Sequence, residues 1–184
     1  MKKATLLLLP ILMICTISTS LSGQIYNLSG TLSGANEVPP TGSTATGTIS
    51  GTYDQATGMI AFDIDFSGLS GNVTGAHLHD APAGSNGGVI INLFPPMVSS
   101  GNIVGNFALP LANEPAFLTG NTYVNIHTSM SPGGEIRAQV IAQPVPPVPT
   151  LQTWGIIILF LTLTILGIFA LKFNSLTFPF IVKK

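Results

Sequence analysis

Apolar and polar residues alternate along the middle of the chain, between residues 24 and 142. The clearest case is the segment 59–66, where four large apolar residues alternate with Ala61, Asp63 and Asp65. A period of two predicts a strand that buries one face and exposes an acidic one.

Gly, Asn, Pro and Ser interrupt the pattern at short intervals, so we expect short antiparallel strands and no helix in this region. The expected strands are 25–32, 45–53, 59–66, 73–79, 89–94, 103–109, 123–127 and 135–142. This spacing predicts an all-β fold, either a single antiparallel β-sandwich or a flattened Greek-key barrel.

A continuous apolar pattern, without charge, occupies residues 154–171. As a helix it would span about 27 Å at about 1.5 Å per residue, which is close to the hydrocarbon thickness of a bilayer. We therefore expect one transmembrane helix over 154–171 and a tail over 172–184. The lysines at 172, 183 and 184 favour the cytoplasmic side for this tail, which leaves the alternating region outside.

The beginning of the chain has the pattern of a secretory signal peptide. Two lysines precede an apolar stretch, residues 4–17, which small polar residues follow. Cleavage after Ser20 and cleavage after Gly23 both suit such a peptide. We assign residues 1–23 to it.

Proline marks the boundary between the alternating region and the apolar run. Four prolines lie within residues 143–153, where they remove backbone donors and favour extended polyproline geometry. We expect a semi-rigid stalk over this segment. Residues 24–142 then form a single domain, which is large enough to bury one core.

The charge of this domain limits the kinds of partner that it can bind. All seven acidic residues of the chain lie within 24–142 and Arg137 is the only basic residue there, which gives a formal charge of −6 that the whole-chain value of −1 hides. A nucleic acid would find almost no counter-charge, so we exclude it as a partner. The single cysteine, Cys15, lies in the signal peptide, so the domain has neither a disulfide nor a thiolate metal site.

The candidate chemistry rests on His77, His79 and His127, which are all the histidines of the chain. His77 and His79 are two apart in an expected strand and so project to one face, where His127 from a paired strand could complete a three-imidazole set for copper or zinc. A His-X-His pair on a β-sandwich resembles copper/zinc superoxide dismutase. The bridging histidine set, the fourth metal-binding histidine and the disulfide of that enzyme are missing.

The alternative for these histidines is structural. Their rings would hydrogen-bond loop carbonyls and close the turn at 80–88, with Asp80 and Glu135 as polar partners. Asp63 and Asp65 share a strand face and are suited to calcium, but no dense acidic loop surrounds them, which favours a solvated acidic face. No Gly-X-Ser-X-Gly elbow supports a hydrolase.

Four blocks carry a family resemblance: Leu-Ser-Gly-Ala-Asn-Glu-Val-Pro-Pro at 32–40, Gly-Ala-His-Leu-His at 75–79, Val-Asn-Ile-His-Thr at 124–128 and Pro-Gly-Gly-Glu-Ile-Arg-Ala-Gln at 132–139. In this order they resemble the CHRD domain, first described in chordin, over residues 28–140. The resemblance implies an all-β extracellular module and does not imply a reaction.

The C-terminal segment resembles the IPTL-CTERM protein-sorting signal. It has Pro149-Thr150-Leu151 and Trp154-Gly155 before the apolar run, with Val148 at the position of the family's first isoleucine. The resemblance implies recognition by an exosortase-type membrane protease in an exopolysaccharide-producing bacterium. If this signal is inert, the helix remains as an anchor.

Two functions from different classes follow. The first is an exported, surface-displayed, non-catalytic module that binds an extracellular protein or polysaccharide and is sorted or anchored through its C-terminal segment. Its location would be the outer face of a membrane, the cell surface or the extracellular matrix of a bacterium, and it would need no cofactor. The alternative is a secreted copper- or zinc-binding domain that uses the three histidines.

Overall fold

The chain divides into two compact units, and the computed structural model describes residues 23–147 and 151–174. The first unit ends at Val145 and the second begins at Pro146. The first contains the strands and a short helix, and the second contains the helix α2 (Leu151–Asn174). Each unit is described separately below.

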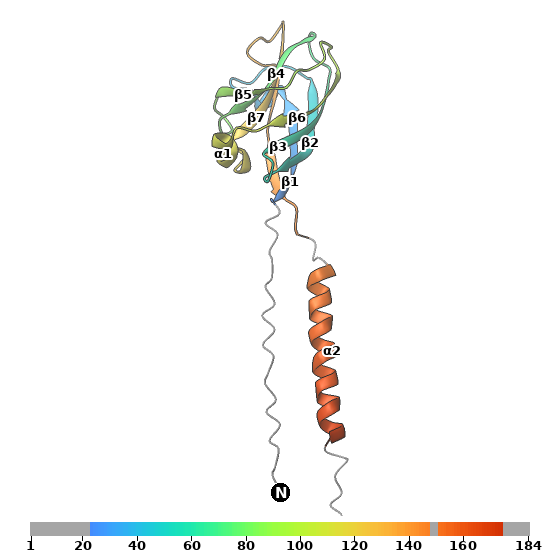
Figure 1. The fold of residues 1–184 in the computed structure, drawn as a ribbon. Coiled ribbons are helices and arrows are strands. Elements are labelled where there is room, and N and C mark those ends of the chain that lie inside the picture. Colours follow the sequence, from blue (N-terminus) through green and yellow to red (C-terminus); the bar gives the residue numbers. More distant parts are fainter. Residues whose placement is uncertain (1–22, 148–150, 175–184) are drawn as a thin grey trace, which may run out of the picture. The chain divides into compact units, whose positions relative to one another are not determined.

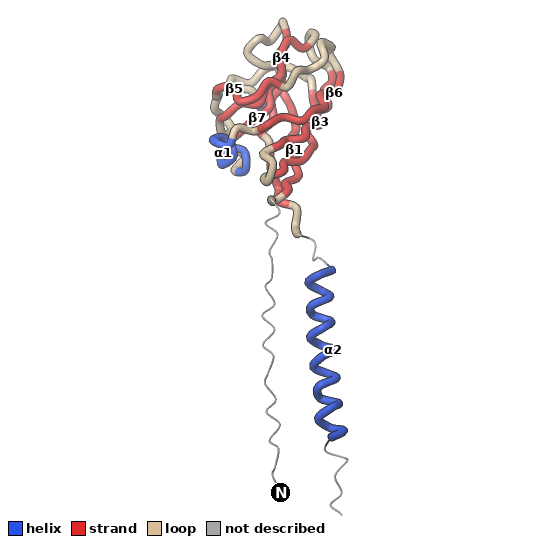
Figure 2. Tube along the Cα trace, viewed as in Figure 1, coloured by secondary structure: helices blue, strands red, loops and turns tan. Residues whose placement is uncertain are grey.

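The first unit is built from one antiparallel sheet (Figures 1 and 2). Seven of the eight expected strands match an observed strand to within two residues at either end, because the period of two reports which side of a strand is buried. The strands within the described residues are β1 (Ile25–Ser33), β2 (Thr46–Asp54), β3 (Met59–Ser67), β4 (Val73–Asp80), β5 (Gly88–Asn92), β6 (Gly101–Ala108), β7 (Thr122–Thr128), β8 (Ile136–Gln139) and β9 (Ile141–Pro144).

The strand order is β5-β4-β7-β8-β1-β2-β3-β6, and β9 pairs with β1. Hairpins join β1, β2 and β3, whereas the chain crosses over between β3 and β4 and between β6 and β7. An up-and-down barrel has no such crossovers, so the connectivity is of the Greek-key kind. The sheet curls into a nearly closed barrel with β5 and β6 at its edges, and the predicted all-β fold class is confirmed.

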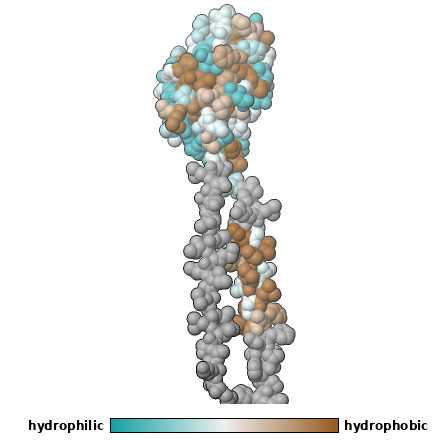
Figure 3. All heavy atoms as spheres, in the orientation of Figure 1, coloured by the Kyte–Doolittle hydropathy of each residue, from teal (hydrophilic) through white to brown (hydrophobic). Residues whose placement is uncertain are grey.

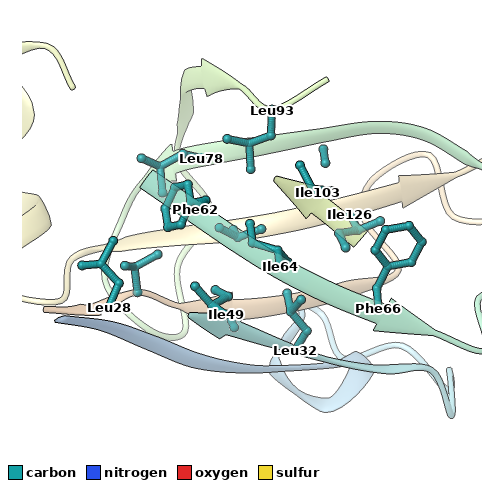
Figure 4. Packing of buried hydrophobic residues seen from close by; sticks show 14 of the residues in the cluster. Leu28, Leu32, Ile49, Phe62, Ile64, Phe66, Leu78, Leu93, Ile103 and Ile126 are labelled. Carbon is teal, nitrogen blue, oxygen red and sulfur yellow. The ribbon is translucent and has the colours of Figure 1, made fainter. Parts of the chain in front are cut away.

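Large apolar side chains from both halves of the sheet meet inside the barrel (Figure 4). Ile64 of β3 is fully buried, as are Leu78 of β4 and Ile126 of β7. Each alternates with residues on the outer side of its strand, so the core takes one side of the sheet. The chemistry of the unit must therefore lie on the outer side.

A short helix, α1 (Glu114–Leu118), packs against the barrel, with the 3-10 turns Gly34–Asn36 and Leu111–Asn113 elsewhere in the unit. The prediction of no helix in this region is wrong. Phe117 is fully buried, with its ring centroid 5.2 Å from that of Tyr53, so one turn of helix suffices to fill a gap in the core. Five residues are too few to show a helical period. Pro115 in the first turn and Gly120 after the last were the available signals.

The eighth expected strand, 135–142, is two strands in the structure. Val140 lies between β8 and β9, fully buried, and its N–H donates to the carbonyl of Thr122 over 2.9 Å. β8 pairs with β7 and with β1, whereas β9 pairs with β1, so pairing with β7 ends near this residue. Pairing with β1 continues to Pro144, and the N–H of Val145 donates to the carbonyl of Ile25. Ordered structure thus extends beyond Gln143, where the sequence pattern suggested that the stalk begins.

The second unit is dominated by α2. Its segment Trp154–Lys172 has a mean hydropathy of 2.5 over a window with no part buried inside the protein, which makes it long and apolar enough to cross a membrane. Brown, hydrophobic residues predominate on the visible side of this helix, whereas the first unit mixes polar and apolar patches (Figure 3). The expected helix over 154–171 lies within α2.

Candidate functional site

The three histidines gather on the outer side of β4 and β7. In the register of this antiparallel pair, His79 lies opposite Tyr123 and Gly75 lies opposite His127. Directly opposite residues point to the same side of a sheet. His77 and His79, two apart on β4, therefore share one side with His127, while the residues between them enter the core.

The three rings lie close to one another. One ring nitrogen from each lies within 4.8 Å of the other two. His77 and His127 are nearest, with 4.9 Å between ring centroids and 3.1 Å between Nδ1 of His77 and Nε2 of His127. The His79 centroid is 5.6 Å from that of His77. A Cβ at Gly75 would lie 3.2 Å from Cε1 of His77, so the glycine leaves room for this ring. The structure thus brings together all three histidines that the sequence singled out.

Loop carbonyls fix the tautomers of two rings. Nδ1 of His79 lies 3.0 Å from the carbonyl oxygen of Gly87, and Nδ1 of His127 lies 3.0 Å from that of Pro132. A carbonyl only accepts, so in the neutral rings each Nδ1 carries the proton and each Nε2 carries a lone pair. Nε2 of His127 then accepts from Nδ1 of His77. Nε2 of His79 is buried and has no hydrogen-bond partner among the described residues.

The structural alternative predicted that the histidine rings contact loop carbonyls, with Asp80 and Glu135 as polar partners. The carbonyl contacts are confirmed, whereas the prediction for the two carboxylates is wrong. Asp80 is next to His79 on β4 and so points to the other side of the strand, where its Oδ2 accepts from Nδ2 of Asn113 over 2.9 Å. Glu135 accepts hydrogen bonds from Ser43, Ser70 and Thr128. Burial alone would raise the pKa of Glu135, but these hydrogen bonds outweigh it and hold that pKa below its ordinary value.

A stack of flat groups continues from the histidines across β7. The rings of His79 and Tyr123 are stacked, with 4.8 Å between centroids and 6° between planes. The guanidinium carbon of Arg137, from β8, lies 3.4 Å from the centroid of the Tyr123 ring. Arg137 is 1% exposed and donates to Asn86, to the carbonyl of Pro82 and to Gln139. The only basic residue of the domain is therefore buried behind the histidine cluster.

Glu37 adds a carboxyl group to this layer. It is 5% exposed, and Nδ2 of Asn125 donates to its Oε2 over 3.3 Å. Its Oε1 and the Oδ1 of Asn125 are buried without a partner among the described residues. Burial raises the pKa of Glu37 to about 7, although the charge of Arg137 and the Asn125 hydrogen bond lower it. Glu37 also lines an open pocket of about 960 Å³.

Sequence reasoning did not include Glu37, Tyr123, Asn125 or Arg137 in the site. The alternation along β7 placed Tyr123 and Asn125 on the outer side, but it gave no sign that the outer side is covered. The isolation of Arg137 among seven carboxylates was the one available signal, since a lone cation in an acidic domain has many possible partners.

Their surroundings disfavour the charged form of all three histidines. Burial is the main cause that lowers the pKa of His77, and the charges of His127 and His79 add to it. Burial likewise lowers the pKa of His79 and of His127, against the opposing effect of the Gly87 and Pro132 carbonyls. Neutral imidazole is the form that binds a metal.

The acidic pair considered for calcium lies on a different outer face. Asp63 and Asp65 of β3 are exposed, and Nδ2 of Asn102 donates to Oδ1 of both, over 2.6 and 2.8 Å. An amide donor between two carboxylates occupies the position that a cation would take, in agreement with a solvated acidic face.

The residues that we expect to form the sorting motif and the signal peptide are largely outside the described residues. This holds for residues 1–22 and for Pro149 and Thr150. Leu151 begins α2, and Trp154 and Gly155 lie within its first turns, with the Trp154 side chain exposed. The structure therefore places only the second half of the motif, on a helix.

The fold and the site define an antiparallel β-barrel module with a covered polar layer on one outer face, followed along the chain by a separate apolar helix. Residues 28–140, more than half of the chain, match the CHRD domain family. The chain belongs to this family of typically extracellular modules, and the resemblance seen in its four sequence blocks is confirmed. No curated protein and no solved structure matches the chain.

Proposed function

We propose that this protein is an exported CHRD module held at the outer face of a bacterial membrane, where it acts without catalysis by binding an extracellular protein or polysaccharide. The observation that carries the proposal is α2, whose Trp154–Lys172 segment is apolar on all sides and buried against nothing in the protein. Such a helix needs an apolar environment, and a bilayer supplies one of the right thickness.

Both ends of the chain support this topology. The pattern of residues 1–23 suits a signal peptide that delivers the β unit, residues 24–142, across the membrane. The lysines at 172, 183 and 184 suit a cytoplasmic tail, residues 172–184. The intervening segment, 143–153, contributes the stalk, and a module displayed in this way meets partners outside the cell.

The acidic β unit favours some partners over others. Its formal charge of −6 disfavours nucleic acids and other polyanions and suits neutral or basic surfaces. A neutral polysaccharide or a basic protein therefore agrees with the charge of the displayed unit.

Membrane insertion can be tested by placing charge in the centre of α2. In spheroplasts that express the full chain, added protease should degrade the β unit. In a separate sample without protease, the β unit should remain with the membrane after carbonate extraction. The double variant Leu161→Lys/Ile165→Lys should move the β unit to the soluble fraction, because each lysine costs about 2.5–3.5 kcal/mol at a helix centre.

Ile165→Leu is the matched control and should behave as wild type. A β unit protected from protease in intact spheroplasts would contradict the proposed orientation. A double lysine variant that still resists carbonate extraction would contradict the role of α2.

Removal of the helix at the sorting motif is a second, separable part of the proposal. In a host with an exosortase, the mature chain should be shorter than in a host without one, as measured by mass spectrometry. Pro149→Ala should restore the longer form, whereas Val148→Ile, which introduces the family's usual residue, should leave processing intact. Equal masses in the two hosts would mean that α2 stays attached as an anchor.

A further inference from the structure

The buried nitrogen of His79 points to a missing ligand. His79 is 8% exposed, and its Nε2 is buried with no partner among the described residues. An unsatisfied buried polar group costs about 1–3 kcal/mol. Because the Gly87 carbonyl holds the proton on Nδ1, this Nε2 presents a lone pair, which calls for a proton donor or a cation.

The His127 ring presents a second lone pair, and the His77 ring can present a third once its proton moves from Nδ1 to Nε2. The Pro132 carbonyl fixes His127 in the same tautomer, with its Nε2 facing the cluster. Nδ1 of His77 lies 3.1 Å from that Nε2, and two nitrogens bound to one metal at about 2.0–2.1 Å lie about 3–3.4 Å apart. The nitrogens of the set lie within 4.8 Å of one another, which exceeds this range by about 1.5 Å, so the rings would have to move closer together around an ion.

The surroundings resemble the outer shell of metal sites. Metal-binding histidines commonly donate their second ring N–H to a backbone carbonyl, which fixes the ring and its tautomer. His79 and His127 both do so here, and Tyr123 stacks on His79. These contacts hold two of the three rings in place before any ion arrives.

The donor set selects the class of ion. Imidazole suits copper and zinc, whereas calcium and magnesium require oxygen ligands. The acidic charge of the β unit raises the local concentration of cations. His77 and His127 are only half-buried, so an ion among the three rings would keep an open position toward solvent.

We infer that Nδ1 of His77 and Nε2 of His79 and His127 form a mononuclear site for a divalent late transition metal ion, with copper(II) bound more tightly than zinc. The relative affinity follows the general order for nitrogen ligands. Binding requires His77 to move its proton from Nδ1 to Nε2. The site does not depend on the membrane tether, so either proposal can fail without the other.

A metal titration tests the site. The chain is purified from membranes in detergent micelles without a polyhistidine tag, freed of metal and titrated with Zn²⁺ against a chromophoric chelator. Wild type should bind one ion per chain. His77→Ala should weaken binding by at least about 100-fold, because loss of an outer-shell partner alone costs about 10–100-fold. With Cu²⁺, the electron paramagnetic resonance spectrum should show coupling to three nitrogens in wild type and to no more than two in the variant.

Asp63→Asn is the matched control, because Asp63 is an exposed carboxylate on the other outer face of the barrel. It should leave both measurements unchanged. Absence of binding by wild type would overturn the site. Binding that His77→Ala leaves intact would also overturn it and would indicate an adventitious ion only. Near-ultraviolet circular dichroism establishes that His77→Ala is folded, since all three tyrosines lie in the β unit.

A second, independent measurement uses spectra of the wild-type protein and needs no variant. The chain has only three histidines, so long-range ¹H–¹⁵N spectra contain only three imidazoles. Before metal is added, His79 and His127 should show the Nδ1–H tautomer, and Zn²⁺ should shift the Nε2 resonance of both. Unshifted resonances would mean that a water molecule satisfies His79, and would overturn the site.

Discussion

The two outer faces of the barrel have the same alternating sequence pattern, but their outward residues differ in exposure to solvent. On β2 and β3, the outward residues are exposed, and Asp63 and Asp65 meet solvent and the amide of Asn102. On β7 and β8, the outward residues Tyr123 and Arg137 are as buried as the core. Alternation thus predicts which residues leave the core, and does not predict whether they reach water.

Two loops cause this difference. The segments 34–40 and 81–87 lie over the β7 and β8 face, and Nδ2 of Asn86 joins them by donating to the carbonyl of Val38 over 2.7 Å. Nδ2 of Asn36 donates to the carbonyl of Arg137, which ties the first segment to β8. Polar groups beneath these loops lose water, so each one depends on its protein partners. A substitution on the covered face should therefore cost much more than one on the open face.

The largest effect is expected at Arg137. Arg137→Ala removes three hydrogen bonds and leaves Glu37 without its nearby positive charge. The three acceptors that lose their donor cost about 1–3 kcal/mol each where they stay buried, so we expect a loss of about 3 kcal/mol or more, which denaturant unfolding followed by tyrosine circular dichroism would measure. Asp63→Asn, the matched change on the open face, should alter the free energy of unfolding by less than about 0.5 kcal/mol.

Arg137→Lys keeps the positive charge but loses the planar guanidinium group. Its loss in free energy of unfolding should lie between those of Arg137→Ala and Asp63→Asn. It also provides a readout if the alanine variant does not fold. Equal losses for Arg137→Ala and Asp63→Asn would remove the distinction between the two faces.

A smaller, pH-dependent effect is expected at Glu37. Its pKa in the folded protein is about 7, above the ordinary 4.5, so between these values the folded protein holds a proton that the unfolded chain has released. Stability contributed by this group is therefore present below pH 4.5 and is lost as the pH rises toward 7. Glu37→Gln should match wild type near pH 4 and exceed its free energy of unfolding by about 3 kcal/mol at pH 8.

The comparison of unfolding curves at several pH values isolates Glu37, because the other carboxyl groups are common to both proteins. Parallel pH profiles for wild type and Glu37→Gln would show that Glu37 reaches water and that the cover is incomplete.

The smallest effect is expected at Tyr123. Its hydroxyl accepts a hydrogen bond from the N–H of Gly87 over 3.2 Å, and Tyr123→Phe leaves this partly buried donor without that partner at a cost of about 1 kcal/mol. Ser50→Ala removes a hydroxyl that donates over the same distance to the carbonyl of Asp63 on the open face. It should cost less than about 0.5 kcal/mol, because water replaces the lost partner. If thermal unfolding shows equal losses, the cover contributes nothing at this position.

Most of the strand pattern could be predicted from the sequence, and the exceptions have identifiable causes. Alternation located the segments from β1 to β7, because burial on one side leaves a local trace. It could not divide residues 135–142, since Val140 continues the apolar pattern while pairing with β7 ends and pairing with β1 goes on. The helix at Glu114–Leu118 was missed because a single turn buries one residue, Phe117, and shows no period.

Only part of the candidate site could be predicted from the sequence. Two histidines in one strand share a face by local geometry, whatever the rest of the fold. Their meeting with His127, fifty residues away, depends on the pairing of β4 with β7, and the buried Nε2 of His79 depends on the loop that brings Gly87 to the ring.

The sequence by itself determined the properties that depend on neighbours along the chain: the strands, the apolar run of α2, the acidic balance and the family. Only the tertiary structure decided which outer face is covered, which histidine nitrogens carry lone pairs and where Arg137 and Glu37 lie. The physical reason is that alternation and charge are local, whereas desolvation of a polar group depends on segments far away in the chain, such as 34–40 and 81–87 over the end of β7.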